Sequence, residues 1–251
     1  MVEREIHFIT YGGGGYFKSS QRLKKQAVET GVFKECRVYT PSCLSKEFQA
    51  EFAPILAKPR GAGYWLWKFD IVQQELHKVR GGDIILYLDA GCTINVPAAS
   101  KLNLYARRLN ESPYNLLSFQ MKWATEKLWT TQQIFKYFKI STSSPAALSG
   151  QYLGGAFFIQ KGPHYRAVLD TCISAIRYDP DLITDKYNTG QLKEFKENRH
   201  DQSIFSLVRK KLGSLVLNYE EINSDKQALT APTPKDLESP IWITRLSDGQ
   251  L

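Results

Sequence analysis

The chain has 251 residues, 43% of them hydrophobic and 23% charged, with a formal net charge of +8. These values predict one globular domain and exclude a disordered or collagen-like chain. The longest apolar runs, at 84–88 and 156–159, are far shorter than the roughly 18 residues of a membrane span. The charged start Met1–Ile6 does not resemble a signal peptide. We therefore expect a soluble, cytoplasmic protein without a transmembrane segment.

The cysteines and the excess of positive charge limit the possible partners. None of the four cysteines forms a C-x-x-C pair, so ordinary thiols in a reducing compartment are expected. The positive charge favours an anionic partner, such as a phosphorylated small molecule, nucleic acid or an acidic membrane face. The longest basic clusters are only 24–25 and 209–211, which argues against a nucleic-acid-binding tail. We expect no nucleic-acid partner.

The N-terminal part of the chain alternates short apolar runs with helical periodicity, which predicts a parallel sheet. The first apolar run ends at four glycines, and the helical pattern after it ends at Gly31. The run that precedes Asp89 is unbroken, as in a central strand covered on both faces. The predicted elements are strands over 6–11, 35–39 and 83–88 and helices over 18–30 and 68–79.

The rest of the chain continues this alternation. Helices are predicted over 99–109, 130–138, 163–176 and 200–211, and strands over 116–119 and 155–160. Residues 178–199 are expected to be irregular. The segment 220–251 has weak periodicity and three prolines, so we expect an irregular C-terminal arm wrapped over the sheet. Together these elements predict a single α/β domain over 1–251, with a Rossmann-like, mixed but mostly parallel sheet flanked by helices.

Ligands of an open parallel sheet bind beyond the carboxyl ends of its strands, which indicates three candidate regions. They are the loop 10–15, the turn Asp89-Ala90-Gly91 and the loop ahead of His200. A carboxylate at the end of a buried strand needs a partner, so Asp89 is either a cap of the turn or a ligand for a cation. The glycine loop matches neither a P-loop nor a dinucleotide fingerprint, and a plain flexible turn explains it equally well.

Aromatic and charged side chains near these loops supply further candidates. Trp65 stands in an aromatic cluster next to Lys68, where its ring would suit a base or a sugar as well as the core. The cations Arg60, Lys68 and Arg199 could neutralise a diphosphate, although isolated cations are more often solvated. Asp201 follows His200 at the start of a predicted helix, where it is either an N-cap or part of a polar site.

Three blocks of the sequence together resemble glycosyltransferases of the GT-A fold. The blocks are 60–68, with Tyr-Trp-Leu-Trp-Lys, 83–92, with Tyr-Leu-Asp-Ala-Gly-Cys, and 199–207, with Arg-His-Asp-Gln-Ser. They are similar to a group of little-characterised bacterial and viral glycosyltransferases associated with polysaccharide or glycan synthesis. The segment 151–159 is similar to the strand that carries Asn-Ala-Gly in glycogenin-like retaining enzymes. The resemblance covers about residues 5 to 211.

The resemblance implies a nucleotide-sugar donor, most often a UDP- or GDP-sugar, and a saccharide or lipid-linked glycan acceptor. It implies catalytic roles for Asp201, Glu126 and Gln202, with Asp201 or Glu126 as the base of an inverting route. The order of the motifs favours retention instead. The residues expected to bind the donor are Thr10, Tyr11, Gly12, Arg60, Trp65, Lys68, Asp89, Ala90, Gly91, Gly154 and Gly155.

The chain departs from the family at the metal-binding motif. Such enzymes usually hold Mn²⁺ or Mg²⁺ on the diphosphate with Asp-x-Asp, but Gly91 stands where the second carboxylate would be. Either Asp89 holds the metal together with His200, or the metal is weak or absent and Arg and Lys side chains stabilise the leaving diphosphate. The positive charge would also suit peripheral contact with an anionic membrane surface.

Two other functions are compatible with these residues. A nucleotidyltransferase would also use a β-α-β nucleotide site and a metal, but only half of its Gly-rich signature with a lysine is present, at 12–15. A non-catalytic module that binds carbohydrate or nucleic acid would use Trp65, Trp67 and the basic surface.

Overall fold

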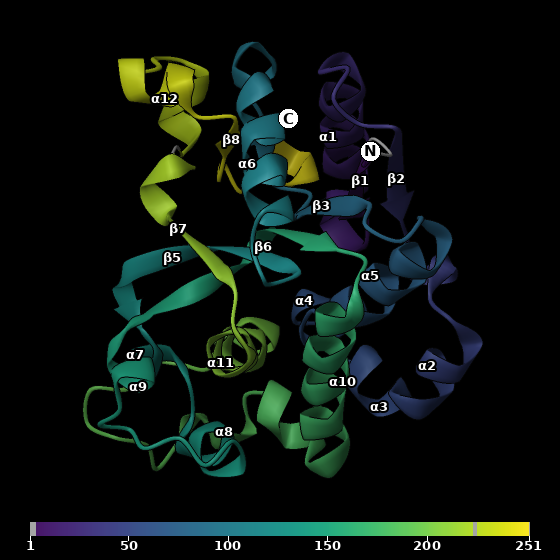
Figure 1. Cartoon of the computed structure of the whole chain (residues 1–251). Helices are drawn as coiled ribbons and strands as arrows, with labels where there is room; N and C mark the ends of the chain where they lie inside the picture. Colours follow the sequence, from purple (N-terminus) through teal and green to yellow (C-terminus); the bar gives the residue numbers. More distant parts are fainter. Residues whose placement is uncertain (1–3, 223–224, 251) are drawn as a thin grey trace.

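The computed structural model describes residues 4–222 and 225–250 and has a six-stranded mixed sheet at its centre (Figure 1). The strand order is β2-β1-β3-β6-β5-β7, and β6 alone runs antiparallel to both of its neighbours. The prediction of a mixed, mostly parallel sheet flanked by helices is therefore confirmed. A second sheet of two short antiparallel strands joins β4 to β8.

Strand β3 lies inside the large sheet because all of its side chains are apolar enough to be covered on both faces. All five of its residues are buried, and Ile85 and Tyr87 face one core while Leu86 faces the other. The strands are β1 (Ile6–Tyr11), β2 (Glu35–Tyr39), β3 (Ile84–Leu88), β4 (Thr93–Ile94), β5 (Leu116–Thr125), β6 (Gly150–Gln160), β7 (Leu215–Asn218) and β8 (Ile241–Trp242).

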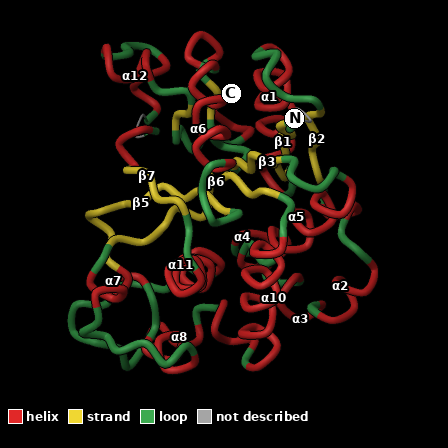
Figure 2. Tube along the Cα trace, viewed as in Figure 1, coloured by secondary structure: helices red, strands yellow, loops and turns green. Residues whose placement is uncertain are grey.

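Helices cover both faces of the sheet. Helices α1 and α6 lie on one face, and α5, α10 and α11 lie on the other (Figures 1 and 2). No helix among the described residues is long and apolar enough to cross a bilayer. The helices are α1 (Phe17–Glu29), α2 (Lys46–Glu51), α3 (Ala53–Leu56), α4 (Gly61–Tyr64), α5 (Trp67–Lys78), α6 (Ser100–Asn110), α7 (Glu126–Trp129), α8 (Gln132–Tyr137), α9 (Pro145–Leu148), α10 (Pro163–Tyr178), α11 (Asp201–Leu212) and α12 (Pro234–Glu238).

The structure differs from the predicted elements mainly where the pattern is interrupted. The helix predicted over 130–138 is α8, which begins only at Gln132, because Thr130 and Thr131 are extended and the Thr131 side chain accepts a hydrogen bond from Ile134 N. The short helix α7, which precedes it, was not predicted. Strands β5 and β6 are longer than predicted, and a register shift between Ser118 and Gln120 disturbs their alternation. The arm over 220–251 contains α12 and β8 beside short 3₁₀ turns.

A buried arginine joins α11 to the sheet. The Arg209 side chain is fully buried, and it donates hydrogen bonds to Ser118 Oγ on β5, to the carbonyls of Tyr152 and Leu153 on β6 and to Phe205 O. Burial lowers the pKa of Arg209 to about 10, so the side chain remains charged at neutral pH. Four acceptors therefore depend on one guanidinium.

We expect Arg209→Ala to destabilise the protein by at least about 3 kcal/mol, because it removes four hydrogen bonds of a fully buried guanidinium. Urea denaturation would measure the change. Arg177→Ala is the matched control, since the exposed Arg177–Glu51 ion pair is expected to be worth less than about 1 kcal/mol. Equal losses in the two variants would contradict this role of Arg209.

Candidate active site

Asp89 ends β3 and presents its carboxylate at the carboxyl edge of the sheet. Its amide donates to Gly155 O at 2.8 Å, and its carbonyl accepts from Cys92 N at 2.9 Å. The Tyr87 hydroxyl donates to Asp89 Oδ1 at 2.6 Å, and the Asp89 side chain is 41% exposed. The side chain does not cap its own turn. It is a fixed carboxylate that remains accessible to a ligand.

A buried lysine lies behind this carboxylate. Lys68 Nζ, on α5, is 2.6 Å from Asp201 Oδ2 and 3.6 Å from Asp89 Oδ1, and it donates to Gly154 O at 3.0 Å. The Lys68 side chain is only 3% exposed, and Asp201 is also buried. Despite burial, the two carboxylates raise the pKa of Lys68, so it remains a cation. Lys68 is therefore the centre of an ion cluster formed by Lys68, Asp89 and Asp201.

Two glycines on β6 make room for this cluster. A β-carbon added at Gly155 would lie 2.5 Å from Asp89 Oδ2, and one added at Gly154 would lie 3.0 Å from the Gln202 side chain. Gln202 Oε1 accepts from Gly154 N at 2.9 Å, while its Nε2 donates to Gln151 Oε1 at 2.6 Å. Gln202 thus holds the strand that accepts the Lys68 hydrogen bond.

The turn after Asp89 is closed by the C-terminal arm. Gly91 O accepts hydrogen bonds from Thr244 Oγ1 at 2.7 Å and from Leu246 N at 2.9 Å. Arg22, on α1, donates to the carbonyl of Cys92 at 2.6 Å and lies 3.4 Å from that of Ala90. The backbone of the turn is therefore held from two sides.

His200 belongs to a different group of side chains. Its Nδ1 lies 2.9 Å from Ile183 O, and its Nε2 lies 3.7 Å from Asp185 Oδ1. Its ring packs against the rings of Tyr64 and Trp65, with centroids 4.8 Å and 5.6 Å away. Arg60 Nη1 and the Tyr64 hydroxyl also bind Asp185, at 2.8 Å and 3.1 Å. Arg60, Trp65 and His200 thus form an Asp185 cluster beside the ion cluster.

These positions bear on the predicted metal ligands. Asp89 offers an accessible carboxylate, and His200 Nε2 is buried without a hydrogen-bond partner, but the groups recorded around His200 belong to the Asp185 cluster. Among the described residues, the possible ligand trios are Glu5-His7-Asp83 and His7-Glu35-Glu75, and neither includes Asp89. Over the described residues, Asp89 is therefore not part of a site with three protein ligands. Mn²⁺ or Mg²⁺ at Asp89 and His200 stays a prediction.

Glu126 lies apart from the ion cluster. Its side chain is fully buried, forms an ion pair with Lys210 Nζ at 2.9 Å and accepts hydrogen bonds from Ser206 and Thr130. The contacts join α7 to α11, and they leave Glu126 no exposed oxygen for an acceptor. The structure therefore favours a positioning role for Glu126 over the predicted catalytic one.

The loop after β1 forms another part of this edge. The Tyr11 ring stacks on Trp67 with centroids 3.7 Å apart, and a β-carbon added at Gly13 would lie 2.5 Å from the ring. Thr10 is fully buried, and Gly12 N donates to Tyr39 O at 2.8 Å. Tyr11 is thus covered by Trp67 and the glycine loop rather than presenting an open ring to a base.

Several residues of the site are absent from the sequence-based prediction. Tyr87, Gln151 and Arg245 carry contacts that become visible only when β3, β6 and the arm are brought together. Tyr87 stands inside an apolar run, where a core role is the ordinary expectation. Gln151 opens the segment 151–159, which resembles a strand of glycogenin-like enzymes, and that likeness was the available signal for it. Its amide is fully buried and therefore needs partners.

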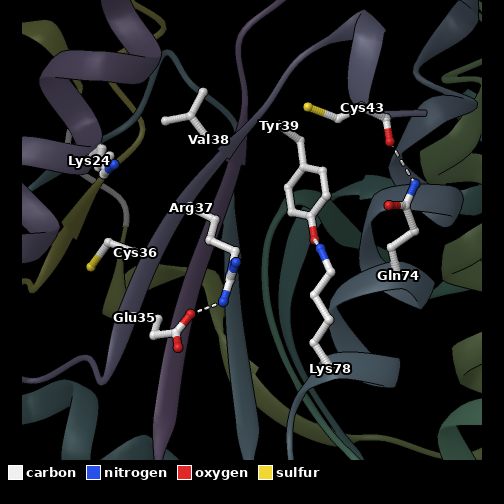
Figure 3. Close-up of a pocket in the computed structure, with 9 residues that line it drawn as sticks. All are labelled: Lys24, Glu35, Cys36, Arg37, Val38, Tyr39, Cys43, Gln74 and Lys78. Atoms are coloured by element: carbon white, nitrogen blue, oxygen red, sulfur yellow. Dashed lines mark hydrogen bonds and ion pairs between the residues drawn. The ribbon is translucent and has the colours of Figure 1, made fainter. Parts of the chain in front are cut away.

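A cavity of about 530 Å³ lies elsewhere, along β2 (Figure 3). It is lined by residues of β2, including Arg37 and Tyr39, and by Lys24 of α1 and Lys78 of α5. The Lys78 ammonium donates to the Tyr39 hydroxyl at 2.8 Å. None of the predicted site residues lines this cavity, so it is not part of the candidate active site.

Comparison with solved structures assigns the fold. Mouse xyloside xylosyltransferase 1 aligns with 98% of this chain and 99% of its own chain, with a TM-score of 0.51 at 10% identity. The galactosyltransferase LgtC, in complex with donor and acceptor sugar analogues, aligns with 95% of this chain and 86% of its own, with a TM-score of 0.51 at 11% identity. The chain has a GT-A fold. No family model and no curated relative matches the sequence.

The GT-A fold also occurs as part of a longer neighbour. GlyE of Streptococcus pneumoniae aligns with 99% of this chain but with 56% of its own length, with a TM-score of 0.50 at 12% identity. At such identities the likeness concerns the fold alone, so the chemistry must be argued from the residues of this chain.

Burial raises the pKa of Asp201 to about 6, although Lys68 acts in the opposite direction. Between about pH 4 and pH 6, Asp201 is therefore protonated in the folded protein. In the unfolded chain, where its pKa has the ordinary value of 3.8, it is ionised over this range. The contribution of this carboxyl to stability consequently decreases as the pH rises from about 4 to 6.

We expect the free energy of unfolding of the wild type, minus that of Asp201→Asn, to decrease over this pH range and to level off above it. Urea denaturation at several pH values would measure the difference, because the asparagine cannot titrate. If the difference instead increased with pH, the prediction would be contradicted. That result would mean that Lys68 outweighs burial and lowers the pKa of Asp201.

Proposed function

We propose that this protein transfers a sugar from a nucleoside-diphosphate sugar to a hydroxyl group of a saccharide or glycan acceptor, as part of polysaccharide or glycoconjugate synthesis. The observation that carries the proposal is the accessible carboxylate of Asp89 at the carboxyl edge of β3, backed by the buried Lys68–Asp201 pair. The GT-A fold supports it, because ligands of such sheets bind at this edge.

In this proposal the donor's diphosphate lies over the turn Asp89-Ala90-Gly91. The loop after β1, with Thr10, Tyr11 and Gly12, borders the nucleotide, and its glycines allow the backbone to approach closely. Lys68 offsets the charge of Asp89 and Asp201, so that the carboxylate edge does not simply repel the phosphates. Arg60 and Trp65, in the Asp185 cluster, would border the sugar or the acceptor.

The transfer breaks the bond between the anomeric carbon and the diphosphate oxygen, and the electron pair leaves with that oxygen. A new bond forms between the anomeric carbon and the acceptor hydroxyl oxygen. We favour retention because Asp201 and Glu126, the two candidate bases for inversion, are 4% and 0% exposed and engage Lys68 and Lys210. The departing phosphate oxygen can then take the hydroxyl proton on the same face of the sugar.

Charge develops on the leaving diphosphate as this bond breaks, so electrostatic stabilisation is expected to be the largest catalytic contribution. The residues fixed around the ion cluster are positioned before the reaction: Tyr87 orients Asp89, and Gln202 accepts a hydrogen bond from the Gly154 amide. Such preorganised groups need not rearrange when the charge appears.

We expect Asp89→Asn to reduce turnover by at least about 100-fold. The melting temperature should stay nearly unchanged, because Asp89 is accessible, does not cap its turn, and leaves Lys68 its closer partner Asp201. The measurement is release of nucleoside diphosphate from UDP-, GDP-, CDP- and dTDP-sugars. Asp170→Asn, an exposed carboxylate on α10, is the matched control and should keep full turnover.

Three outcomes would contradict the proposal. A large loss of stability in Asp89→Asn would assign Asp89 a structural role. Release of pyrophosphate from nucleoside triphosphates would indicate a nucleotidyltransferase. Binding of nucleotide sugars or glycans without turnover, in the presence and absence of Mn²⁺, would indicate a binding module.

A further inference from the structure

The arm that closes the Asp89 turn brings an arginine to the place of the missing carboxylate. A β-carbon added at Gly91 would lie 3.0 Å from Arg245 Cα and 3.2 Å from Leu246 N. Contacts this close to backbone atoms are tight, so a side chain at this position would require the arm to shift by a few tenths of an ångström. Gly91 therefore lets the arm lie against the turn, and a second metal-binding carboxylate at that position would displace the arm.

Arg245 is held in an uncommon backbone conformation at this point. Its φ is +54°, in the left-handed region that side chains other than glycine rarely adopt. The strain is maintained by its neighbours: Leu246 N and Thr244 Oγ1 both donate to Gly91 O, and Thr244 Oγ1 lies 2.9 Å from Thr93 Oγ1. Backbone strain of this kind persists where the surrounding contacts impose it, often at ligand sites.

The Arg245 side chain is exposed. Burial, and after it the positive charge of Arg245, lowers the pKa of a second arginine, Arg199. In the described part of the chain, neither has a carboxylate within 4.0 Å. Glu197, which also acts on Arg199, forms an ion pair with Arg60 at 3.2 Å.

Arg199 is fixed by aromatic contacts instead of by an ion pair. Its guanidinium carbon lies 3.8 Å from the ring centroid of Trp129 and 5.7 Å from that of Trp123. Its backbone amide donates to Ser203 Oγ at 3.0 Å. Such stacking orients a guanidinium and leaves its N–H donors free for an anion.

The charges around the turn leave an excess that suits a diphosphate. Lys68 Nζ lies 3.6 Å from Asp89 Oδ1, Arg22 donates to the carbonyl of Cys92, and the backbone of Arg245 lies against Gly91. With Asp201, which pairs with Lys68, and Arg199, two residues before it in the chain, the group comprises four cations and two carboxylates. A nucleotide sugar carries about one negative charge on each of its two phosphates, as phosphodiesters do. The excess of two positive charges therefore equals in size the negative charge of the diphosphate.

We propose that Arg245, together with Arg199, binds the donor's diphosphate in the place that a metal ion held by a second carboxylate would take. The inference rests on the proposed function, since it names how that site holds its donor. Arginine suits the role, because its planar fork binds phosphate oxygens in a bidentate manner and stays charged at any physiological pH. Diphosphate binding then requires no divalent metal and weakens with salt.

Binding of UDP, GDP and inorganic pyrophosphate, measured by calorimetry in EDTA and in Mn²⁺, tests the proposal. We expect the same affinity in both buffers, and about a tenfold or greater weakening of the tightest-binding of these probes in Arg245→Ala. Arg245→Lys should recover part of the loss, because charge without the fork is retained. Arg166→Ala, an exposed arginine on α10, is the matched control and should bind like the wild type.

Uridine and guanosine separate the diphosphate contact from the rest of the site, since any nucleoside binding should be unchanged in Arg245→Ala. The inference is overturned if EDTA abolishes diphosphate binding, if Arg245→Ala binds as tightly as the wild type, or if no probe binds. Sugar transfer that requires Mn²⁺ would overturn it while leaving the proposed function intact. Arg245-dependent binding of pyrophosphate without any sugar transfer would support it while the proposed function failed.

Discussion

The ammonium group of Lys68 is the constraint on which the site depends. A buried charge is tolerated only with close partners, and Lys68 finds them on three elements: Asp201 on α11, Gly154 O on β6 and Asp89 at the end of β3. Helix α5 carries the lysine itself. The interaction therefore determines where these four elements meet, and it orients the accessible carboxylate at the edge of the sheet.

The same interaction shows how far the sequence predicts the site. Asp89 follows an unbroken apolar run, which is typical of a central strand, so its place at the carboxyl edge of the sheet could be predicted. Lys68 was predicted as a free cation for the diphosphate, but its nearest partner is Asp201, 133 positions away in the chain. Pairing over such a separation depends on tertiary packing, which local patterns do not encode. The buried ion pair of Glu126 with Lys210 was missed for the same reason.

Glycines allow the close contacts between the elements of the site. At positions 154 and 155 they admit Gln202 and Asp89, and at position 91 a glycine admits the backbone of the arm. From the sequence alone, Gly91 indicates only that a metal ligand is missing. In the structure, the absence of a side chain at Gly91 also allows the backbone of the arm to approach closely, which brings Arg245 to the turn. The arm has weak periodicity, so no pattern in the chain indicates this contact.

The fold and the local charges therefore depend on different constraints. A sheet of this topology superposes on sugar transferases at 10% to 11% identity, because buried apolar strands tolerate many substitutions of similar volume. The edge has no such tolerance, because each buried charge there needs a specific partner. If Arg245 takes the place of a metal ion held by a second carboxylate, the positive charge that binds the donor belongs to the chain and not to a metal ion from solvent. The position of Arg245 then depends on the arm remaining docked. Donor binding is therefore coupled to the stability of the β4–β8 pairing and of the hydrogen bond from Thr244 to Gly91 O.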